Sequence, residues 1–173
     1  MIILLTGGSA CGKSTFAEEM CMNLPHPRIY LACMRPYGSE ADMRIARHRK
    51  MRQDKGFETL EKYTDIHEAD IPKGATVLLE CLCNLTANEM FDENGNILYG
   101  AEEKIISGIK AAAKKAGTLI IVTNEVGSGG TEYDGNTNKY ISVLGRINRE
   151  AAKLADTVIE TVCGIPVILK GSL

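Results

Sequence analysis

Gly7-Gly8-Ser9-Ala10-Cys11-Gly12-Lys13-Ser14 fits the phosphate-binding loop pattern G-x-x-x-x-G-K-[ST], which specifies a strand–loop–helix unit. The apolar run 1–6 before it predicts a buried strand, and residues 15–22 after it predict a helix. In such a unit, backbone N–H groups and the helix N-terminus converge on phosphate. The alternative is a glycine-rich turn whose Lys and Ser face solvent. We predict instead that Lys13 reaches the β- and γ-phosphates of a nucleoside triphosphate, and that Ser14 holds Mg²⁺.

The composition is that of one globular domain over residues 1–173, with 45% hydrophobic and 24% charged residues. A formal net charge of −2 argues against nucleic acid as a partner, since duplex binding needs a basic face. No apolar run reaches the length of a membrane span. The six cysteines form no C-x-x-C pair, so we expect reduced thiols in a cytoplasmic enzyme.

Apolar runs alternate with helical patterns along the rest of the chain. Strands are predicted at 29–33, 76–80, 118–123 and 157–162, and helices at about 40–54, 83–91, 101–116 and 138–155. Residues 167–170 follow a turn too short for a crossover helix, so this strand should pair antiparallel with the one before it. The prediction is an α/β P-loop three-layer sandwich, with a mostly parallel sheet and an antiparallel C-terminal edge strand. Ligands of such sheets bind at the carboxyl ends of the strands, here the loops from Gly7, Cys33, Glu80 and Asn124.

Glu80 ends the apolar run 77–79, where a second magnesium-binding carboxylate would lie in a phosphate-loop enzyme. The alternative is an acid that caps the helix beginning near Asn84. A carboxylate at the end of a central strand faces the site, so we predict that Glu80 binds Mg²⁺ together with Ser14.

Residues 44–52 hold five Lys or Arg, and Arg44, His48 and Arg52 are spaced four apart, so a helix would place them on one stripe. A charge run alone usually forms a solvated face. The histidine favours an anion site instead, because flanking arginines disfavour the imidazolium and leave a neutral, nucleophilic ring. We predict that His48 takes a nucleotidyl or phosphoryl group and passes it on. His26 lies in a loop and His67 in a solvated segment, with no metal-ligand spacing.

Two elements of the chain are especially distinctive: Arg44-Ile45 followed by His48, and Asn124-Glu125-Val126-Gly127 followed by Gly129. They occur together with the phosphate loop, Tyr30-Leu31-Ala32, Thr59-Leu60-Glu61, Leu78-Leu79-Glu80-Cys81, Gly145-Arg146-Ile147-Asn148, Ala155-Asp156 and Gly164-Ile165-Pro166. In these elements the chain resembles, nearly end to end, the bifunctional adenosylcobinamide kinase/adenosylcobinamide-phosphate guanylyltransferase family.

The resemblance implies phosphorylation of the aminopropanol hydroxyl of adenosylcobinamide, then transfer of GMP from GTP through a guanylylated histidine. It implies His48 as that nucleophile and Lys13 as its catalytic partner, with Mg²⁺, GTP and ATP, a corrinoid substrate and a symmetric homo-oligomer such as a trimer. The nucleotide contacts that it implies are Gly7 to Ser14, Ala32, Cys33, Met34, Arg49, Lys50, Met51, Arg52, Glu61 and Glu80.

The chain departs from the family pattern mainly between Gly127 and Ser142. The family has a proline, an arginine and an aromatic-Arg-Asp element there, and this chain has Glu132, Asn138, Tyr140, Ile141 and Ser142 at those positions. Only the aromatic residue is kept. Cys33 also replaces a more usual polar residue. The stretch 127–138, rich in Gly, Asn and Thr, predicts a loop.

Two other functions are open to a phosphate-loop protein. A plain small-molecule kinase would use His48 only as a phosphate clamp and form no covalent nucleotide. A GTP-hydrolysing switch would need an Asp-x-x-Gly element after a strand and an Asp that reads guanine. The stretch 92–95 lies in a polar loop and 138–141 lacks that Asp, so the sequence disfavours the switch.

Overall fold

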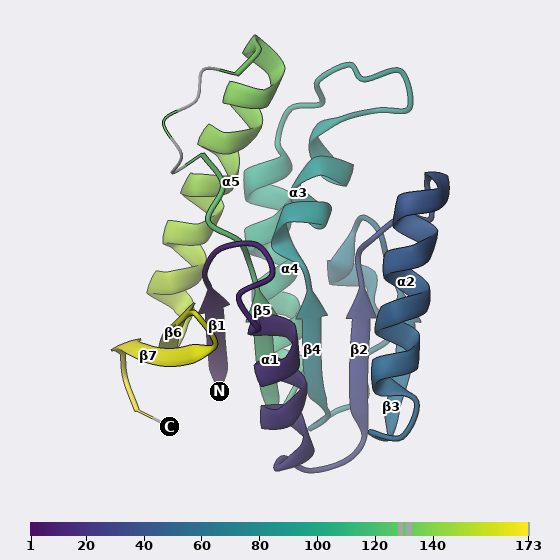
Figure 1. The fold of residues 1–173 in the computed structure, drawn as a ribbon, viewed down its shortest axis with the longest axis vertical. Helices are drawn as coiled ribbons and strands as arrows, with labels where there is room; N and C mark the ends of the chain where they lie inside the picture. The colour runs from purple at the N-terminus through teal and green to yellow at the C-terminus, as the bar shows by residue number, and fades with distance from the viewer. Residues whose placement is uncertain (128–129, 131–132, 173) are drawn as a thin grey trace.

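The structure is a computed structural model that describes residues 1–127, 130 and 133–172; the side chains of Glu40, Ala41, Arg44 and Met51 also lie outside the described part. A seven-stranded sheet has the order β3-β2-β4-β5-β1-β6-β7 (Figure 1). The strands are β1 (Ile2–Thr6), β2 (Arg28–Ala32), β3 (Phe57–Glu61), β4 (Thr76–Glu80), β5 (Thr118–Val122), β6 (Thr157–Val162) and β7 (Ile165–Lys170).

All neighbouring strands pair in parallel except β7, which pairs antiparallel with β6. Every residue of β4 and β5 is buried, which explains their continuous apolar runs, because a central parallel strand is covered on both faces. Only residues 163–164 separate β6 from β7, too few for a crossover. The predicted fold class is therefore confirmed, including the antiparallel edge.

Helices form the two outer layers. The helices are α1 (Lys13–Met22), α2 (Gly38–Arg52), α3 (Leu82–Met90), α4 (Ala101–Lys115) and α5 (Gly135–Leu154). In Figure 1, α1 lies in front of the sheet, α4 lies behind it, and α2 stands beside β2 and β3 at one edge. The contacts agree, since α1 packs on β1, β4 and β5, while α4 and α5 pack on each other and α3 on both. None of the described helices has the length and hydrophobicity needed to cross a bilayer.

The carboxyl ends of the inner strands meet at one edge of the sheet. Ala32 pairs with Glu80, and Glu80 pairs with Val122, so β2, β4 and β5 end in register. β1 ends beside them, because its Leu5 pairs with Val122. The loops that the sequence singled out therefore leave the sheet side by side, as expected for a ligand site.

The strand β3 was missing from the sequence prediction. Its residues Phe-Glu-Thr-Leu-Glu are intermediate or exposed, and it pairs only with β2. An edge strand of this kind needs no continuous apolar run, so the pattern that revealed the central strands is absent here. The omission matters because β3 carries Glu61 into the site.

The helix α5 begins three residues before the predicted start at 138. Asp134 caps it, since its Oδ1 accepts hydrogen bonds of 2.9 Å from the backbone N–H groups of Asn136 and Thr137. The hydroxyl of Tyr140 donates to the carbonyl oxygen of Cys83 at 3.1 Å and so ties α5 to α3. Glu132, one of the unusual residues of this segment, lies outside the described residues.

Candidate active site

The phosphate loop connects β1 to α1 in a conformation that requires glycine at two positions. Gly7 has φ +139°, and a Cβ there would lie 2.5 Å from the carbonyl oxygen of Thr161. Gly12 has φ +97° and directly precedes α1. Other residues rarely adopt these angles, so the two glycines let the loop turn tightly and present the N-terminus of α1.

Lys13 is only 5% exposed and lies over the loop. Its Nζ donates to the carbonyl oxygens of Gly7, at 2.9 Å, and Gly8. The ammonium group thus lies against the phosphate loop, the position from which it would contact a bound phosphate.

Glu80, at the end of β4, lies next to Ser14. Its Oε1 accepts a hydrogen bond of 2.5 Å from the Ser14 hydroxyl. A hydroxyl and a carboxylate side by side suit Mg²⁺, which prefers oxygen ligands and uses few protein groups beside phosphates. The alternative, in which Glu80 caps the following helix, is wrong, because α3 begins at Leu82 without a side-chain cap.

Tyr30 and His48 meet the other side of this carboxylate. The Tyr30 hydroxyl donates to Oε2 of Glu80 at 3.2 Å and lies 3.4 Å from Nδ1 of His48. That nitrogen is 3.7 Å from Oε1 of Glu80. Burial, and then the charge of Glu80, raises the pKa of Tyr30 far above its ordinary value, so the phenol keeps its proton. Histidine, carboxylate and phosphate loop therefore form one cluster.

Arg52 is a buried cation beside this cluster. It is 6% exposed, and its guanidinium carbon lies 3.3 Å from the centroid of the Tyr30 ring, a cation–π contact. Its buried Nη1 has no hydrogen-bond partner among the described residues. A buried charged donor left without an acceptor is costly, which points to an anion as its partner.

These groups line one cavity of about 870 Å³. It runs from the phosphate loop between α2, β2 and β3 on one side and the ends of β4 and β5 on the other. Its lining residues are Ser9, Ala10, Cys11, Gly12, Lys13, Ser14, Thr15, Tyr30, Ala32, Met34, Pro36, Asp42, Ile45, Ala46, Arg47, His48, Arg49, Arg52, Thr59, Glu61, Tyr63, Glu80, Cys81, Cys83, Asn84, Val122 and Asn124.

Residues 3–169 match the family model described as cobinamide kinase / cobinamide phosphate guanyltransferase. The chain belongs to this family. The family is one of bifunctional kinases and guanylyltransferases, so the resemblance seen in the sequence is confirmed and the protein is an enzyme. A GTP-binding switch is thereby excluded as its class.

Curated relatives cover nearly the whole chain. The bifunctional adenosylcobalamin biosynthesis protein CobU of Escherichia coli is 32% identical over 98% of this chain and 100% of its own length. The corresponding protein CobP of Pseudomonas aeruginosa is 27% identical over 97% and 96%.

Solved structures show the same fold at low sequence identity. An ATPase from the type III secretion system of pathogenic bacteria has a TM-score of 0.54 and 14% identity, over 92% of this chain and 51% of that one. The flagellar accessory protein FlaH of Methanocaldococcus jannaschii has a TM-score of 0.50 and 14% identity, over 99% and 78%. These similarities support the assignment of a phosphate-loop fold to this member of the cobinamide kinase/guanylyltransferase family.

Glu61 lies in the cavity of this family member, held by two partners. Tyr63 donates to its Oε2 at 2.8 Å, and Nη2 of Arg49 contacts its Oε1 at 2.7 Å. The hydrogen bonds from Tyr63 and then from Arg49 lower the pKa of Glu61. The carboxylate is therefore ionised at neutral pH and faces the site as an acceptor.

The structure does not bring every predicted residue to the cavity. Lys50 is exposed and absent from the lining. Cys33 is buried, and its thiol donates to the carbonyl oxygen of Leu31. Gly7 and Gly8 are absent from the lining, although their carbonyl oxygens accept hydrogen bonds from Lys13. The side chain of Met51 lies outside the described residues. The residues predicted to contact the nucleotide are neighbours in the chain, but their side chains lie in three places: the cavity, the core and solvent.

Tyr30 is the most important residue that the sequence analysis gave no role. Its signal was weak, a single polar side chain in the apolar run 29–33. In the sheet, Tyr30 pairs with Leu78, so Glu80 lies two residues further along β4 and on the same face. Only this register reveals that the two side chains meet.

The six cysteines are free thiols, and Cys81 and Cys83 line the cavity. A hydrogen bond from the Cys81 thiol lowers the pKa of Cys83 to about 6. The cytoplasmic, reducing location expected from the cysteines stays a prediction.

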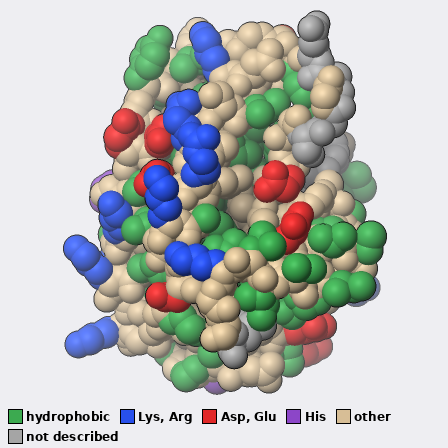
Figure 2. All heavy atoms as spheres, turned by 90° about the vertical axis from the view of Figure 1, so that its left-hand side faces the viewer, with side chains coloured by type: hydrophobic (Ala, Val, Ile, Leu, Met, Phe, Trp, Pro, Cys, Tyr) green, Lys and Arg blue, Asp and Glu red, His purple; other side chains and the backbone are tan. Residues whose placement is uncertain are grey.

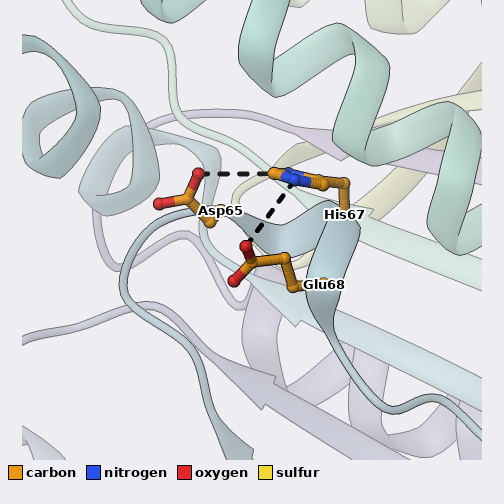
Figure 3. A group of neighbouring side chains, drawn as sticks. All are labelled: Asp65, His67 and Glu68. Atoms are coloured by element: carbon orange, nitrogen blue, oxygen red, sulfur yellow. Dashed lines mark ion pairs between the residues drawn. The ribbon is translucent and has the colours of Figure 1, made fainter.

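Asp65, His67 and Glu68 form a separate group on the surface. Figure 3 shows the Asp65 and Glu68 carboxylates beside the His67 ring. Nδ1 of His67 lies 4.0 Å from Oδ1 of Asp65, and Nε2 lies 3.9 Å from Oε1 of Glu68. Lys104 pairs with Asp65 at 2.8 Å, and Lys62 pairs with Glu68 at 2.7 Å. Because lysines already neutralise the two acids, we interpret the group as a surface ion-pair cluster. His67 is solvated, as its sequence context predicted.

Proposed function

We propose that this enzyme phosphorylates the aminopropanol hydroxyl of adenosylcobinamide and then transfers GMP from GTP to that phosphate through His48. Family membership supports the two activities. The observation that carries the role of His48 is its position 3.7 Å from Glu80, which itself contacts Ser14 of the phosphate loop. A nucleophile there lies beside the groups that would hold a triphosphate.

In the kinase step, the phosphate loop and Lys13 would bind the β- and γ-phosphates, as in other phosphate-loop enzymes. Ser14 and Glu80 would hold Mg²⁺, which neutralises phosphate charge when bound. The substrate oxygen attacks the γ-phosphorus, and the bond to the β-phosphate oxygen breaks as the nucleoside diphosphate leaves with the electron pair. The hydroxyl proton is released. This chain's part is to orient the triphosphate and stabilise its charge.

In the guanylyl step, a ring nitrogen of His48 attacks the α-phosphorus of GTP. The bond to the β-phosphate oxygen breaks, and pyrophosphate leaves with the electron pair. A phosphate oxygen of adenosylcobinamide phosphate then attacks the same phosphorus, and the nitrogen–phosphorus bond breaks. Arg52 is suited to stabilise the α-phosphate, because it is a buried cation with a donor that has no partner among the described residues.

The test is the intact mass of the protein after incubation with GTP and Mg²⁺, quenched in alkali because a phosphoramidate is acid-labile. We expect an increase equal to one GMP, lost after acid treatment and located on the peptide that contains His48. GTP hydrolysis or phosphoryl transfer without this adduct would favour the plain kinase. An adduct on another residue would contradict the role of His48.

We also propose that the enzyme forms a homo-oligomer, a trimer by the family resemblance. All residues of β7 are exposed, including four large apolar side chains: Ile165, Val167, Ile168 and Leu169. Figure 2, which faces the side of the molecule that carries α5 and β7, shows apolar side chains gathered on its lower part. An exposed apolar edge strand is typical of an interface.

Ile168→Glu is expected to weaken this assembly, because burying an unpaired carboxylate in an interface is costly. Sedimentation velocity at several concentrations measures the shift to monomer, with the exposed polar change Lys153→Gln on α5 as the control. A wild-type monomer at all concentrations would contradict the proposed oligomer, and an unchanged Ile168→Glu oligomer would contradict the role of β7.

A further inference from the structure

Tyr30 lies between His48 and Glu80 and touches both. Its hydroxyl is 3.4 Å from Nδ1 of His48 and 3.2 Å from Oε2 of Glu80. The phosphate loop and the Ser14–Glu80 pair leave this hydroxyl without a role, and a buried polar group placed at a nucleophile needs an explanation.

A count of protons decides the direction of these hydrogen bonds. An ionised carboxylate only accepts, and the Glu80 side chain already accepts from Ser14. The Tyr30 hydroxyl has one proton, which it gives to Glu80, so toward His48 its oxygen can only accept. Nδ1 of His48 must therefore carry the hydrogen, and Oε1 of Glu80, 3.7 Å away, favours the same arrangement.

We propose that Tyr30 is a positioning residue for guanylyl transfer, which holds His48 in the Nδ1–H tautomer so that the lone pair of Nε2 faces the α-phosphorus. The proposal rests on the function proposed for His48. In a neutral imidazole one nitrogen carries hydrogen and the other the lone pair, so fixing the first selects the second as the nucleophile. The same logic orients the histidine of serine hydrolases through a carboxylate.

The arrangement also stabilises the positive charge that develops on the His48 ring during guanylyl transfer. When the Nε2 lone pair forms the bond to phosphorus and pyrophosphate leaves, the ring, still protonated on Nδ1, becomes cationic. The negative charge of Glu80 lies within 3.7 Å of Nδ1, and Tyr30 links the two. When the acceptor phosphate attacks, the nitrogen–phosphorus bond breaks, and the electron pair returns to Nε2. The proton on Nδ1 need not move in either step.

The phenol ring is itself held in place. The guanidinium of Arg52 stacks on one face, 3.3 Å from the centroid, and Phe57 meets the ring edge-on at 6.4 Å between centroids. Tyr30 is buried in β2, paired with β3 and β4. A hydroxyl fixed by a strand and two packed neighbours can set the orientation of a side chain on α2, most of whose described residues are exposed.

The experiment compares wild type with Tyr30→Phe, which removes the hydroxyl and keeps the ring. Two-bond ¹H–¹⁵N correlation of histidine-labelled protein without nucleotide reads the tautomer of His48 directly. We expect Nδ1–H in wild type and a shift toward Nε2–H in Tyr30→Phe. Tyr140→Phe, which loses a comparable internal hydroxyl bond to Cys83, is the matched control and should keep the wild-type tautomer.

The kinetic measurement is the single-turnover rate of GMP adduct formation. We expect Tyr30→Phe to slow it about 100-fold, with little change in the GTP concentration for half-saturation. Nε2–H in wild type, or an unchanged tautomer and rate in Tyr30→Phe, would overturn the proposal. Absence of an adduct in wild type would overturn the function proposed for His48 itself. The spectrum recorded without nucleotide reports the tautomer independently of adduct formation, so it shows which of the two proposals is wrong.

Discussion

His48→Ala is expected to abolish guanylyl transfer while cobinamide phosphorylation persists. The transfer needs a nucleophile at the α-phosphorus, and deleting the nucleophile of a covalent mechanism costs about 10⁴-fold or more. Phosphorylation relies on the phosphate loop, Lys13 and the Ser14–Glu80 pair, none of which the change removes. We expect the kinase rate to stay within about tenfold, the loss reflecting one positioning contact.

Two labels separate the activities. Transfer of γ-labelled phosphate to cobinamide reports the kinase step, and transfer of α-labelled GMP to cobinamide phosphate reports the second. His67→Ala is the matched control, because His67 is 45% exposed and lies in the surface cluster with Asp65 and Glu68. Equal loss of both activities in His48→Ala would mean that His48 acts as a phosphate clamp, as in a plain kinase.

Lys13→Ala is expected to remove both activities. The ammonium is buried over the loop, where both reactions need positive charge near the β- and γ-phosphates. Removing one such electrostatic contact lowers turnover about 10²–10³-fold, and here both steps lose it. The same two assays measure the effect.

The control is Lys153→Ala, since Lys153 is 71% exposed on α5 and its ammonium group pairs with Glu150 at 2.7 Å. Thermal unfolding checks the fold of Lys13→Ala, in which the carbonyl oxygens of Gly7 and Gly8 lose their donor. If a folded Lys13→Ala enzyme kept either activity near the wild-type level, the phosphate-loop interpretation would be wrong.

Part of the active site was predictable from local sequence. Ser14 and Glu80 were paired as magnesium ligands from a motif and a strand end, and the structure brings them into contact. His48 was selected from the charges around it, and it lies at that same pair. These roles remain proposals, but the proximity they require is present.

Other predicted contacts grouped residues that are neighbours in the chain but whose side chains the structure separates. Lys50 was grouped with Arg49 and Arg52, yet one turn of helix sends adjacent side chains in different directions, and Lys50 faces solvent. Cys33 was predicted to contact the nucleotide because it follows Ala32 in the chain. Side chains alternate along a strand, so Ala32 lines the cavity while the Cys33 thiol lies in the core.

Sequence patterns were enough to recognise the family, the strand–loop–helix unit at residues 1–22, and the parallel sheet with its antiparallel edge. These features depend on local requirements: glycine where φ is positive, apolar runs where both faces are covered, and turns too short for a helix. Other features emerge only in the folded chain: β3 completes the sheet, Arg52 is buried on the Tyr30 ring, and Tyr30 joins His48 to Glu80. Those contacts join residues 18 to 50 positions apart, and they arise from the register of β2 with β4 and the placement of α2 over them. No local pattern encodes such a meeting, because a side chain's distant neighbours are set only when the sheet has formed.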